Sequence, residues 1–369
     1  MKILFLISGW KVPSSRFRVL QYVPYLRAAR HECLVLAGYP PKYAHLPALG
    51  WRLSNALRYV VRAAQRIGLT ARRFDVVFVE RELFDDDSLV LERWFRRLGR
   101  ALVLDVDDAI YLKHPAKFRA LASSSDRVIV GNNALLAHVK TINARVALVP
   151  TSVDFSKYAY EPRRAEGHAG ARVIGWTGTA SNLPYLRQIV EPLRDLACEH
   201  EFELRIISDG SLEQQALDFA GVSVRHIQWS EAIEIEGLRQ FDIGIMPLAD
   251  DAWCRGKCGL KAIQYLAAGI PAVVSPVGAG VEIVEHGKNG FHARSAQEWK
   301  HALARLLADT ALRSAMGAAG RTIVEQRYSV SANLPKVLAA LDAALDHARE
   351  KSPVARVSDP GRSGTRRGS

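Results

Sequence analysis

The sequence predicts an α/β protein of two tandem domains, each built on a parallel sheet covered by helices. Three observations support this prediction. The chain has 369 residues, about twice the length of a common domain. In both halves, short apolar runs alternate with longer amphipathic segments, which is the pattern of parallel strands joined by helices. Between the halves, residues 161–170 are polar and small and form the predicted linker.

The first half, residues 1–160, is the predicted N-terminal domain. Its predicted strands are 2–7, 32–36, 76–79, 101–104, 127–130 and 147–149. Its predicted helices are 18–29, 53–67, 88–98 and 133–141. The apolar run that begins the chain is too short for the core of a secretory signal, which favours a first strand.

The second half, residues 171–328, repeats the alternation and is the predicted C-terminal domain. Its predicted strands are 173–176, 203–208, 222–226, 243–246 and 272–275. Its predicted helices are 185–199, 260–268, 296–308 and 310–326, and one long helix over 329–350 follows them. Residues 351–369 are rich in Gly, Ser, Pro and Arg, a composition that predicts a disordered basic tail. Two such domains in tandem leave a cleft between them.

Composition and charge restrict the classes of function. Hydrophobic residues make up 49% and charged residues 24% of the chain, as in soluble globular proteins, and no apolar run is long enough to span a bilayer. The cysteines lack the second close pair that a zinc site needs, so we expect reduced thiols in the cytoplasm. They are Cys33, Cys198, Cys254 and Cys258. A net charge of +12 favours anionic partners: phosphorylated substrates, an anionic membrane surface or nucleic acid. No nucleic-acid motif accompanies the charge, so we expect no nucleic-acid partner.

The most specific segment covers residues 253–291, WCRGKCGLKAIQYLAAGIPAVVSPVGAGVEIVEHGKNGF. It predicts a glycine-rich loop that opens a helix, a buried strand, and a second glycine turn at Gly278 that opens a short helix. Free N–H groups at a helix N-terminus suit a diphosphate, and three cations lie at the first helix. These cations are Arg255, Lys257 and Lys261. Any doubly wound domain has turns of this kind, so this segment alone leaves its function open.

Four motifs in order give the second half a resemblance to a known family. They are IGWTGTASNLPYL (174–186), FDIGIMPL (241–248), GLKAIQYLAAGIPAVVSPVG (259–278) and HGKNGF (286–291). Their order resembles that of the family-4 glycosyltransferases of the GT-B fold. The resemblance implies two Rossmann-like domains facing a cleft and a nucleoside-diphosphate sugar bound mainly by the second domain. It further implies transfer of the sugar to an acceptor hydroxyl with retention at the anomeric carbon, without a metal or other cofactor.

The resemblance also implies a set of donor-site residues. They are Gly9, Thr177, Gly178, Thr179, Trp229, Gly256, Gly259, Leu260, Gln264 and Gly278. Arg255, Lys257 and Lys261 would stabilise the negative charge that builds on the departing diphosphate, which is the catalytic role we assign to them. Trp229 would flank the nucleotide base, and ordinary core packing is the alternative for this residue.

One departure from the family pattern concerns two glutamates that, in many members, have seven residues between them. Gly256 and Gln264 occupy these positions here. The amide of Gln264 can still accept from or donate to a ribose hydroxyl. The absence of a carboxylate at Gly256 leaves open how the transferred sugar is oriented.

Charged residues of the first half are candidates for the acceptor side. Arg16 and Arg18 follow the first strand in SGWKVPSSRFRVLQYVPYL (8–26), either as phosphate contacts or as solvated arginines. Glu80, Asp107 and Asp108 follow the ends of strands, where open α/β sheets bind ligands. The run 105–108 also fits the Asp-x-Asp metal motif of the single-domain GT-A glycosyltransferases, and helix capping is a third interpretation.

A basic amphipathic segment covers residues 51–73. It has six arginines and no acid among its apolar residues: Arg52, Arg58, Arg62, Arg66, Arg72 and Arg73. Such a helix either lies on an anionic membrane or is a solvated surface helix. The first interpretation predicts a peripheral enzyme on the inner face of the membrane that glycosylates a glycan or lipid-linked acceptor.

Together these features predict a cytoplasmic glycosyltransferase of cell-surface glycan or polysaccharide biosynthesis. The alternatives are a GT-B sugar-nucleotide epimerase and a catalytically silent sugar-nucleotide-binding protein.

Overall fold

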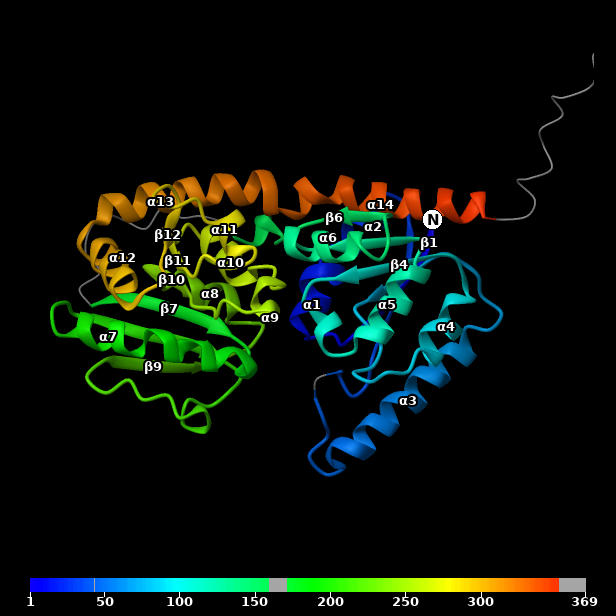
Figure 1. Cartoon of the computed structure of the whole chain (residues 1–369), viewed down its shortest axis with the longest axis horizontal. Helices are drawn as coiled ribbons and strands as arrows, with labels where there is room; N and C mark the ends of the chain where they lie inside the picture. The colour runs from blue at the N-terminus through cyan, green and yellow to red at the C-terminus, as the bar shows by residue number, and fades with distance from the viewer. Residues whose placement is uncertain (43, 159–170, 352–369) are drawn as a thin grey trace, which may run out of the picture.

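The computed structural model describes residues 1–42, 44–158 and 171–351, which form two α/β domains (Figure 1). Each domain has a six-stranded sheet, with strand orders β2-β1-β3-β4-β5-β6 and β12-β11-β10-β7-β8-β9. Neighbouring strands pair in parallel, as the alternation of strands and helices predicted. The predicted linker 161–170, and the predicted tail beyond residue 351, lie outside the described residues.

The first sheet follows the predicted strands closely. Its strands are β1 (Lys2–Ile7), β2 (Glu32–Ala37), β3 (Phe74–Glu80), β4 (Gly99–Val106), β5 (Arg127–Val130) and β6 (Val146–Leu148). Its helices are α1 (Pro13–Ser15), α2 (Val23–Ala28), α3 (Gly50–Gly68), α4 (Val90–Arg96), α5 (Pro115–Ser124) and α6 (Asn133–Lys140). β1, β3 and β4 are buried almost throughout because helices cover both faces of the sheet. The predicted helix 18–29 is divided into a π-helical turn, η1 (Arg16–Leu20), and α2, which begins next to Pro24.

The second sheet contains β7 (Arg172–Gly178), β8 (Phe202–Ser208), β9 (Ser223–Gln228), β10 (Ile243–Met246), β11 (Ala272–Val274) and β12 (Gly290–His292). Its helices are α7 (Val190–Ala197), α8 (Glu234–Arg239), α9 (Ala252–Arg255), α10 (Leu260–Ala267), α11 (Gly280–Ile283), α12 (Ala296–Ala308) and α13 (Thr310–Ile323). The predicted helix 185–199 is α-helical only from Val190, because a 3₁₀ segment, η4 (Ala180–Ile189), contains Pro184.

The last helix, α14 (Val330–Glu350), returns to the N-terminal domain. Figure 1 shows it running along the first sheet after α13 has covered the second. Its buried face includes Val337 and Leu341, which belong to one hydrophobic cluster with Ile3 and Phe5. The crossing is held at Val153, which exchanges backbone hydrogen bonds with Tyr328 and Val330. The two domains are therefore joined by both this crossing and the segment that links the sheets.

The structure reverses the predicted orientation of the basic helix. α3 buries Arg58, Arg62 and Arg66, whereas Leu53 and Val60 lie on its exposed side. The buried guanidinium groups donate to backbone carbonyl oxygens: Arg58 to those of Pro40, Pro41 and Ala44, Arg62 to those of Ile7 and Leu36, and Arg66 to that of Trp94. The arginine side chains thus add donors to carbonyl groups at strand ends and in loops, some of which, such as that of Ile7, also accept from a backbone N–H. The expectation that these three arginines face a membrane is wrong.

Candidate active site

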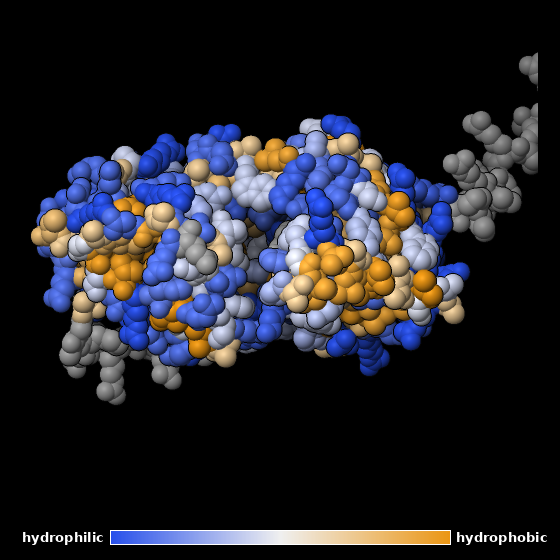
Figure 2. All heavy atoms as spheres, turned by 90° about the horizontal axis from the view of Figure 1, so that it is seen from below, coloured by the Kyte–Doolittle hydropathy of each residue, from blue (hydrophilic) through white to orange (hydrophobic). Residues whose placement is uncertain are grey.

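The candidate site lies where the two domains meet. Viewed from below, the molecule is hollowed between its halves (Figure 2). Loops from both domains reach this boundary: those after β4 and β5 on one side, and those before α10 and α11 on the other. They touch directly, because the Sγ of Cys258 donates to the carbonyl oxygen of Asp107 at 3.0 Å. The amide of Asn132 donates to the carbonyl oxygens of Arg255 and Lys257, at 3.3 and 3.0 Å.

Gly256 lies at a close approach between the backbones of the two domains. A Cβ atom built at this position would be 2.7 Å from the Cβ and 2.8 Å from the backbone N of Ala109. No side chain fits there while the domains hold this arrangement. The close approach of the two backbones thus accounts for a glycine where many members of the resembled family have a glutamate.

Two glycine turns of the C-terminal domain pack together, as the sequence predicted. Gly259 precedes α10 with a φ of +67°, and Gly278 precedes α11 with a φ of +53°. A Cβ at Gly278 would be 2.6 Å from the carbonyl oxygen of Arg255, and one at Gly259 would collide with Ile283. Leu260 is the first residue of α10. The N-terminus of this helix therefore opens beside the turn at Gly278.

Two lysines of the signature segment lie together over the end of β7. The Nζ of Lys261 is 5.4 Å from the ring centre of Trp176, and its Cε would be 2.7 Å from a Cβ at Gly178. The Nζ of Lys257 donates to Oδ1 of Asn182 at 3.1 Å. The pKa of Lys261 is lowered to about 7, first by burial and then by the positive charge of Lys257, while Asp108 opposes the shift. An anion beside these ammonium groups would oppose the shift, because it favours the charged form of Lys261.

Arg255 does not join the two lysines. Its side chain is 58% exposed, and its Nε donates to Oδ1 of Asp250 at 2.8 Å. The prediction of a third catalytic cation assumed that neighbours in sequence share one face. Arg255 instead ends α9, and it contributes its backbone carbonyl group to the contact with Asn132.

The remaining predicted donor residues surround the lysines at different depths. The backbone N–H of Thr177 donates to the hydroxyl of Tyr265 at 3.1 Å, so it is already paired. The hydroxyl of Thr179 accepts from the amide of Asn182 at 2.7 Å. Gln264 is buried, and its Nε2 donates to the hydroxyl of Tyr158 at 3.3 Å. The predicted contact of Gln264 with a ribose hydroxyl would therefore use its amide oxygen.

Trp229 is half-buried at the edge of the C-terminal core. The guanidinium carbon of Arg16 lies 5.5 Å from the centre of its ring. The structure thus brings together a predicted donor residue and a predicted acceptor residue from opposite domains.

The turn after β1 is occupied by protein rather than open to a donor. A Cβ at Gly9 would be 2.9 Å from the Cβ of Pro41, so Pro41 fills the space beside this glycine, where a sugar-nucleotide was expected. The carboxylate of Glu80 is buried and accepts from the backbone N–H of Ser8 at 2.8 Å and from the hydroxyl of Ser15 at 2.6 Å. Burial raises the pKa of Glu80 despite these hydrogen bonds and nearby Arg81. Glu80 and Gly9 hold the turn, and neither faces the cleft.

Arg16 and Arg18 have different environments. Arg18 is buried and forms a bidentate ion pair with Asp105, with N···O distances of 2.6 and 3.0 Å, so the prediction that it faces the cleft is wrong. Arg16 does reach the other domain, where it forms a bidentate pair with Glu234 at 2.6 and 3.2 Å. No sequence pattern indicated this partner, because α8 was not predicted.

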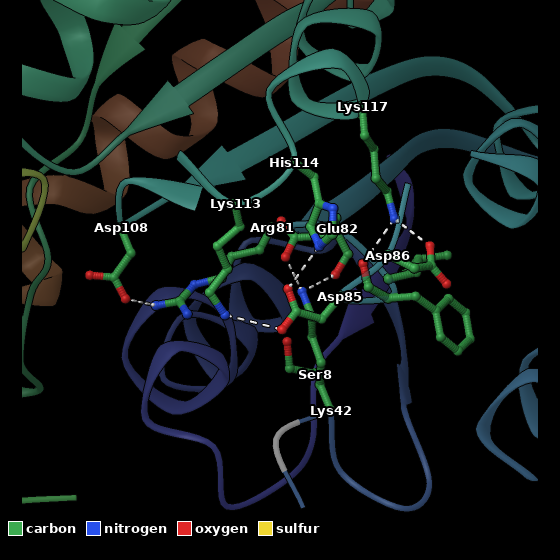
Figure 3. A network of polar contacts seen from close by, with 12 residues as sticks. Ser8, Lys42, Arg81, Glu82, Asp85, Asp86, Asp108, Lys113, His114 and Lys117 are labelled. Atoms are coloured by element: carbon green, nitrogen blue, oxygen red, sulfur yellow. Dashed lines mark hydrogen bonds and ion pairs between the residues drawn. The ribbon is translucent and has the colours of Figure 1, made fainter. Parts of the chain in front are cut away.

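Asp107 and Asp108 share one arginine. Arg81, which has a left-handed φ of 58°, donates to both carboxylates, at 2.7 Å for Asp108 (Figure 3). Burial alone would raise the pKa of Asp107, but Arg81 holds it below its usual value. Burial raises the pKa of Asp108 more than Arg81 lowers it. Because Asp105 and Asp107 are both paired with buried arginines, the Asp-x-Asp metal interpretation is not supported. In the described ranges, no group of three or more metal-ligating side chains occurs.

A second polar network supports the loop beside Arg81, as Figure 3 shows. Lys42 forms a buried ion pair with Glu82, and Lys117 donates to the carbonyl oxygen of Phe84 at 2.8 Å. His114 lies between Asp85 and Asp87, with N···O distances of 3.3 and 2.9 Å. These contacts fix the acidic loop that follows β3 on the N-terminal side of the boundary.

Comparison with solved structures identifies the architecture. HepE from Anabaena, in complex with UDP, has a TM-score of 0.68 and 19% identity over 93% of this chain and all of that one. Sucrose-phosphate synthase from Thermosynechococcus elongatus has a TM-score of 0.68 and 16% identity over the same shares. The chain has the GT-B fold. The catalytic domain of starch synthase IV from Arabidopsis thaliana, bound to ADP and acarbose, has a TM-score of 0.68 and 11% identity to this chain. The match covers 94% of this chain and 99% of the starch synthase chain.

Sequence comparison adds information on the second domain. Residues 171–309 match the model of the family described as glycosyl transferases group 1. This match supports placing the second domain in the group 1 glycosyltransferase superfamily. The predicted assignment to family 4 is narrower than this match and stays a prediction. D-inositol 3-phosphate glycosyltransferase from Corynebacterium urealyticum is 28% identical over 225 residues, or 53% of this chain and 52% of that protein. The match thus spans about half the length of this curated relative.

Proposed function

We propose that this GT-B protein is a glycosyltransferase that moves a sugar from a nucleoside diphosphate to an acceptor hydroxyl. One observation supports this most strongly: Lys257 and Lys261 lie together over the end of β7, beside the N-terminus of α10 and facing the other domain. The group 1 match covers all of these elements. Uridine diphosphate, bound by the structural neighbour HepE, belongs to the donor class proposed.

In the proposed reaction, the bond between the anomeric carbon and the diphosphate oxygen breaks, and a bond to the acceptor oxygen forms. Negative charge builds on the departing diphosphate, where two ammonium groups and the N–H groups of α10 stabilise it. The acceptor hydroxyl passes its proton to a phosphate oxygen. No metal or side-chain base is needed in this scheme, and the sugar keeps its anomeric configuration as the family resemblance implies.

Asp108 is the proposed contact to the transferred sugar. It follows β4 next to Ala109, which occupies the space where a glutamate at Gly256 would extend. Its charge acts on both Lys257 and Lys261, so its carboxylate lies close to the cations. We propose that the N-terminal domain supplies, through Asp108, a carboxylate that the signature loop of this chain lacks.

The test is an assay of purified protein with labelled nucleoside-diphosphate sugars that differ in base and sugar. We expect slow donor hydrolysis when water is the only acceptor, and faster donor cleavage, with the sugar on the acceptor hydroxyl, when an acceptor is added. Lys261→Met should lower turnover about 100-fold or more, because a charge that acts in the transition state is lost. Lys288→Met, which removes an exposed lysine paired with Glu285, is the matched control. Interconversion of donors would support an epimerase instead, and binding without turnover a sugar-nucleotide-binding protein.

Glycans of the cell surface are the proposed acceptor class, from the family resemblance. Cytoplasmic location at the inner membrane face is proposed with it. Among the described helices, none is long and apolar enough to cross a bilayer.

A further inference from the structure

The exposed side of α3 is an apolar stripe. Leu53, Val60 and Ile67 are 59, 64 and 61% exposed, and they lie seven residues apart on one face of the helix. Exposed Ala56 and Ala64 fill the intervals, and Trp51 is exposed at the first turn. From below, Figure 2 shows a hydrophobic patch on the N-terminal half at this position, on the same side as the hollow between the domains.

The stripe is held outward by the opposite face of the same helix. Arg58, Arg62 and Arg66 are hydrogen-bonded to backbone carbonyl groups of the domain, so α3 cannot rotate to bury its apolar residues without breaking these bonds. The outward orientation is therefore part of the folded state. No folding step is needed before the stripe meets a partner.

The charges around the stripe indicate what kind of partner covers it. Residues 50–73 include no Asp or Glu. Arg52 is exposed near the start of α3, and Arg72 and Arg73 are exposed just after its end. Arg97 is a further exposed cation near this end of α3. Burial lowers the pKa of Arg66 in the last turn of the helix, and the positive charge of Arg97, like that of Arg73, lowers it further. An apolar stripe between cationic ends matches a bilayer with anionic headgroups, in which a helix lies flat at the interface.

We propose that α3 is an interfacial membrane-binding helix whose apolar stripe enters an anionic bilayer while its buried arginines anchor it to the domain. The exposed arginines at its ends contact lipid phosphates. Because the stripe and the hollow face the same side, bound protein presents its cleft to the membrane surface. That the cleft then receives a lipid-linked acceptor rests on the proposed function, whereas membrane binding does not.

The test is co-sedimentation of the full chain with vesicles of phosphatidylcholine alone or mixed with phosphatidylglycerol. We expect binding to the anionic vesicles, weakened at high salt, and at least tenfold weaker binding of the double variant Val60→Glu/Ile67→Glu. Ala315→Glu and Ala318→Glu on exposed positions of α13 form the matched control and should bind like the wild type. Hydrolysis of soluble donor by the α3 variant should be unchanged, which separates this surface from the active site.

Wild-type protein that stays in the supernatant, or an α3 variant that sediments as well as the wild type, would overturn the proposal. Light scattering, which measures the oligomeric state in solution, provides a second test. A wild-type dimer that the α3 variant converts to a monomer would assign the stripe to a second copy of the chain and would also overturn it.

Discussion

The backbones of Gly256 and Ala109, from opposite domains, approach so closely that a Cβ on Gly256 would lie 2.8 Å from the amide nitrogen of Ala109. The loop that opens α10 is thereby pressed against the end of β4. This contact brings Lys257 and Lys261 within reach of Asp108, so the candidate site draws charged groups from both domains.

Restoring the family's carboxylate should therefore impair the protein. Gly256→Glu places a side chain against backbone atoms of Ala109 and should destabilise the closed arrangement by about 1–3 kcal/mol, as overpacking does elsewhere. We expect lower turnover and a lower melting temperature. Gly68→Ala in α3, where an added Cβ meets no atom within 4 Å, is the control and should be neutral or slightly stabilising. A Gly256→Glu enzyme with increased activity would show that the domains separate more readily than this contact implies.

The fold was predictable where burial alone decides the structure. β1, β5 and β10 match their predicted bounds, since each is a short apolar run in the middle of a parallel sheet. α8 was missed because it has only six residues, and α5 was missed because it begins at Pro115, which was not read as a helix start. The face of α3 was predicted wrongly, because the carbonyl groups that bind its arginines belong to segments distant in sequence.

The candidate site was predictable only in its C-terminal half. The lysines and glycine turns of residues 253–291 come from one continuous segment, so local spacing placed them correctly. Arg18 and Glu80 are buried by partners from elements distant in sequence, Asp105 of β4 and Ser15 of α1, which no local pattern reveals. Arg81 and Asn132 were missed for the same reason, although each follows a predicted strand.

Donor binding should depend on pH through Lys261. Its pKa is about 7 in the free protein, and a bound diphosphate should raise that pKa by favouring the charged form. Above pH 7, binding then requires proton uptake, so the Kd of UDP should increase by up to about tenfold per pH unit. Titration calorimetry between pH 7 and 9 measures this effect. Lys261→Met should show a much flatter profile, and equal slopes for the two proteins would exclude Lys261 from the phosphate site.

Lys261 should also lower the free energy of unfolding at neutral pH. Lys261 has a pKa of about 7 in the folded chain and its ordinary 10.5 when unfolded, so between these values the unfolded state binds more protons. The free energy of unfolding therefore gains a contribution that rises with pH across this window, and the full penalty is present below pH 7. Lys261→Met should stabilise the protein at pH 7 by about 1 kcal/mol, after allowance for solvent screening. Denaturant unfolding at pH 7 and pH 10 should show this advantage shrinking; an advantage independent of pH would contradict the assignment.

The ion pair between Arg16 and Glu234 should help to hold the domains together. Both side chains are largely buried, so Arg16→Ala leaves a carboxylate without its partner and should loosen the closed arrangement. We expect a larger radius of gyration in small-angle X-ray scattering. The exchange Arg16→Glu/Glu234→Arg should restore part of the compaction, whereas either single reversal should not. Unchanged scattering of Arg16→Ala would indicate that the contacts of Asn132 and Cys258 suffice.

Arg62 should be necessary for the stability of the N-terminal domain. It donates to the carbonyl oxygens of Ile7 and Leu36, so Arg62→Met removes hydrogen bonds from two carbonyl groups in the domain and should cost about 2–4 kcal/mol of unfolding free energy. Arg52→Met, on the exposed side of α3, should change it by less than about 0.5 kcal/mol. Denaturant unfolding compares the two variants, and equal small effects would contradict the structural role of the buried arginines.

The central claim is that the two lysines beside α10 bind the diphosphate of the donor. Titration calorimetry with UDP, GDP and ADP at pH 7, on the wild type and on Lys257→Met/Lys261→Met, tests it most directly. At least one nucleotide should bind the wild type, and its Kd should increase tenfold or more in the double variant. Equal affinity of the two proteins for every nucleotide that binds would contradict the claim.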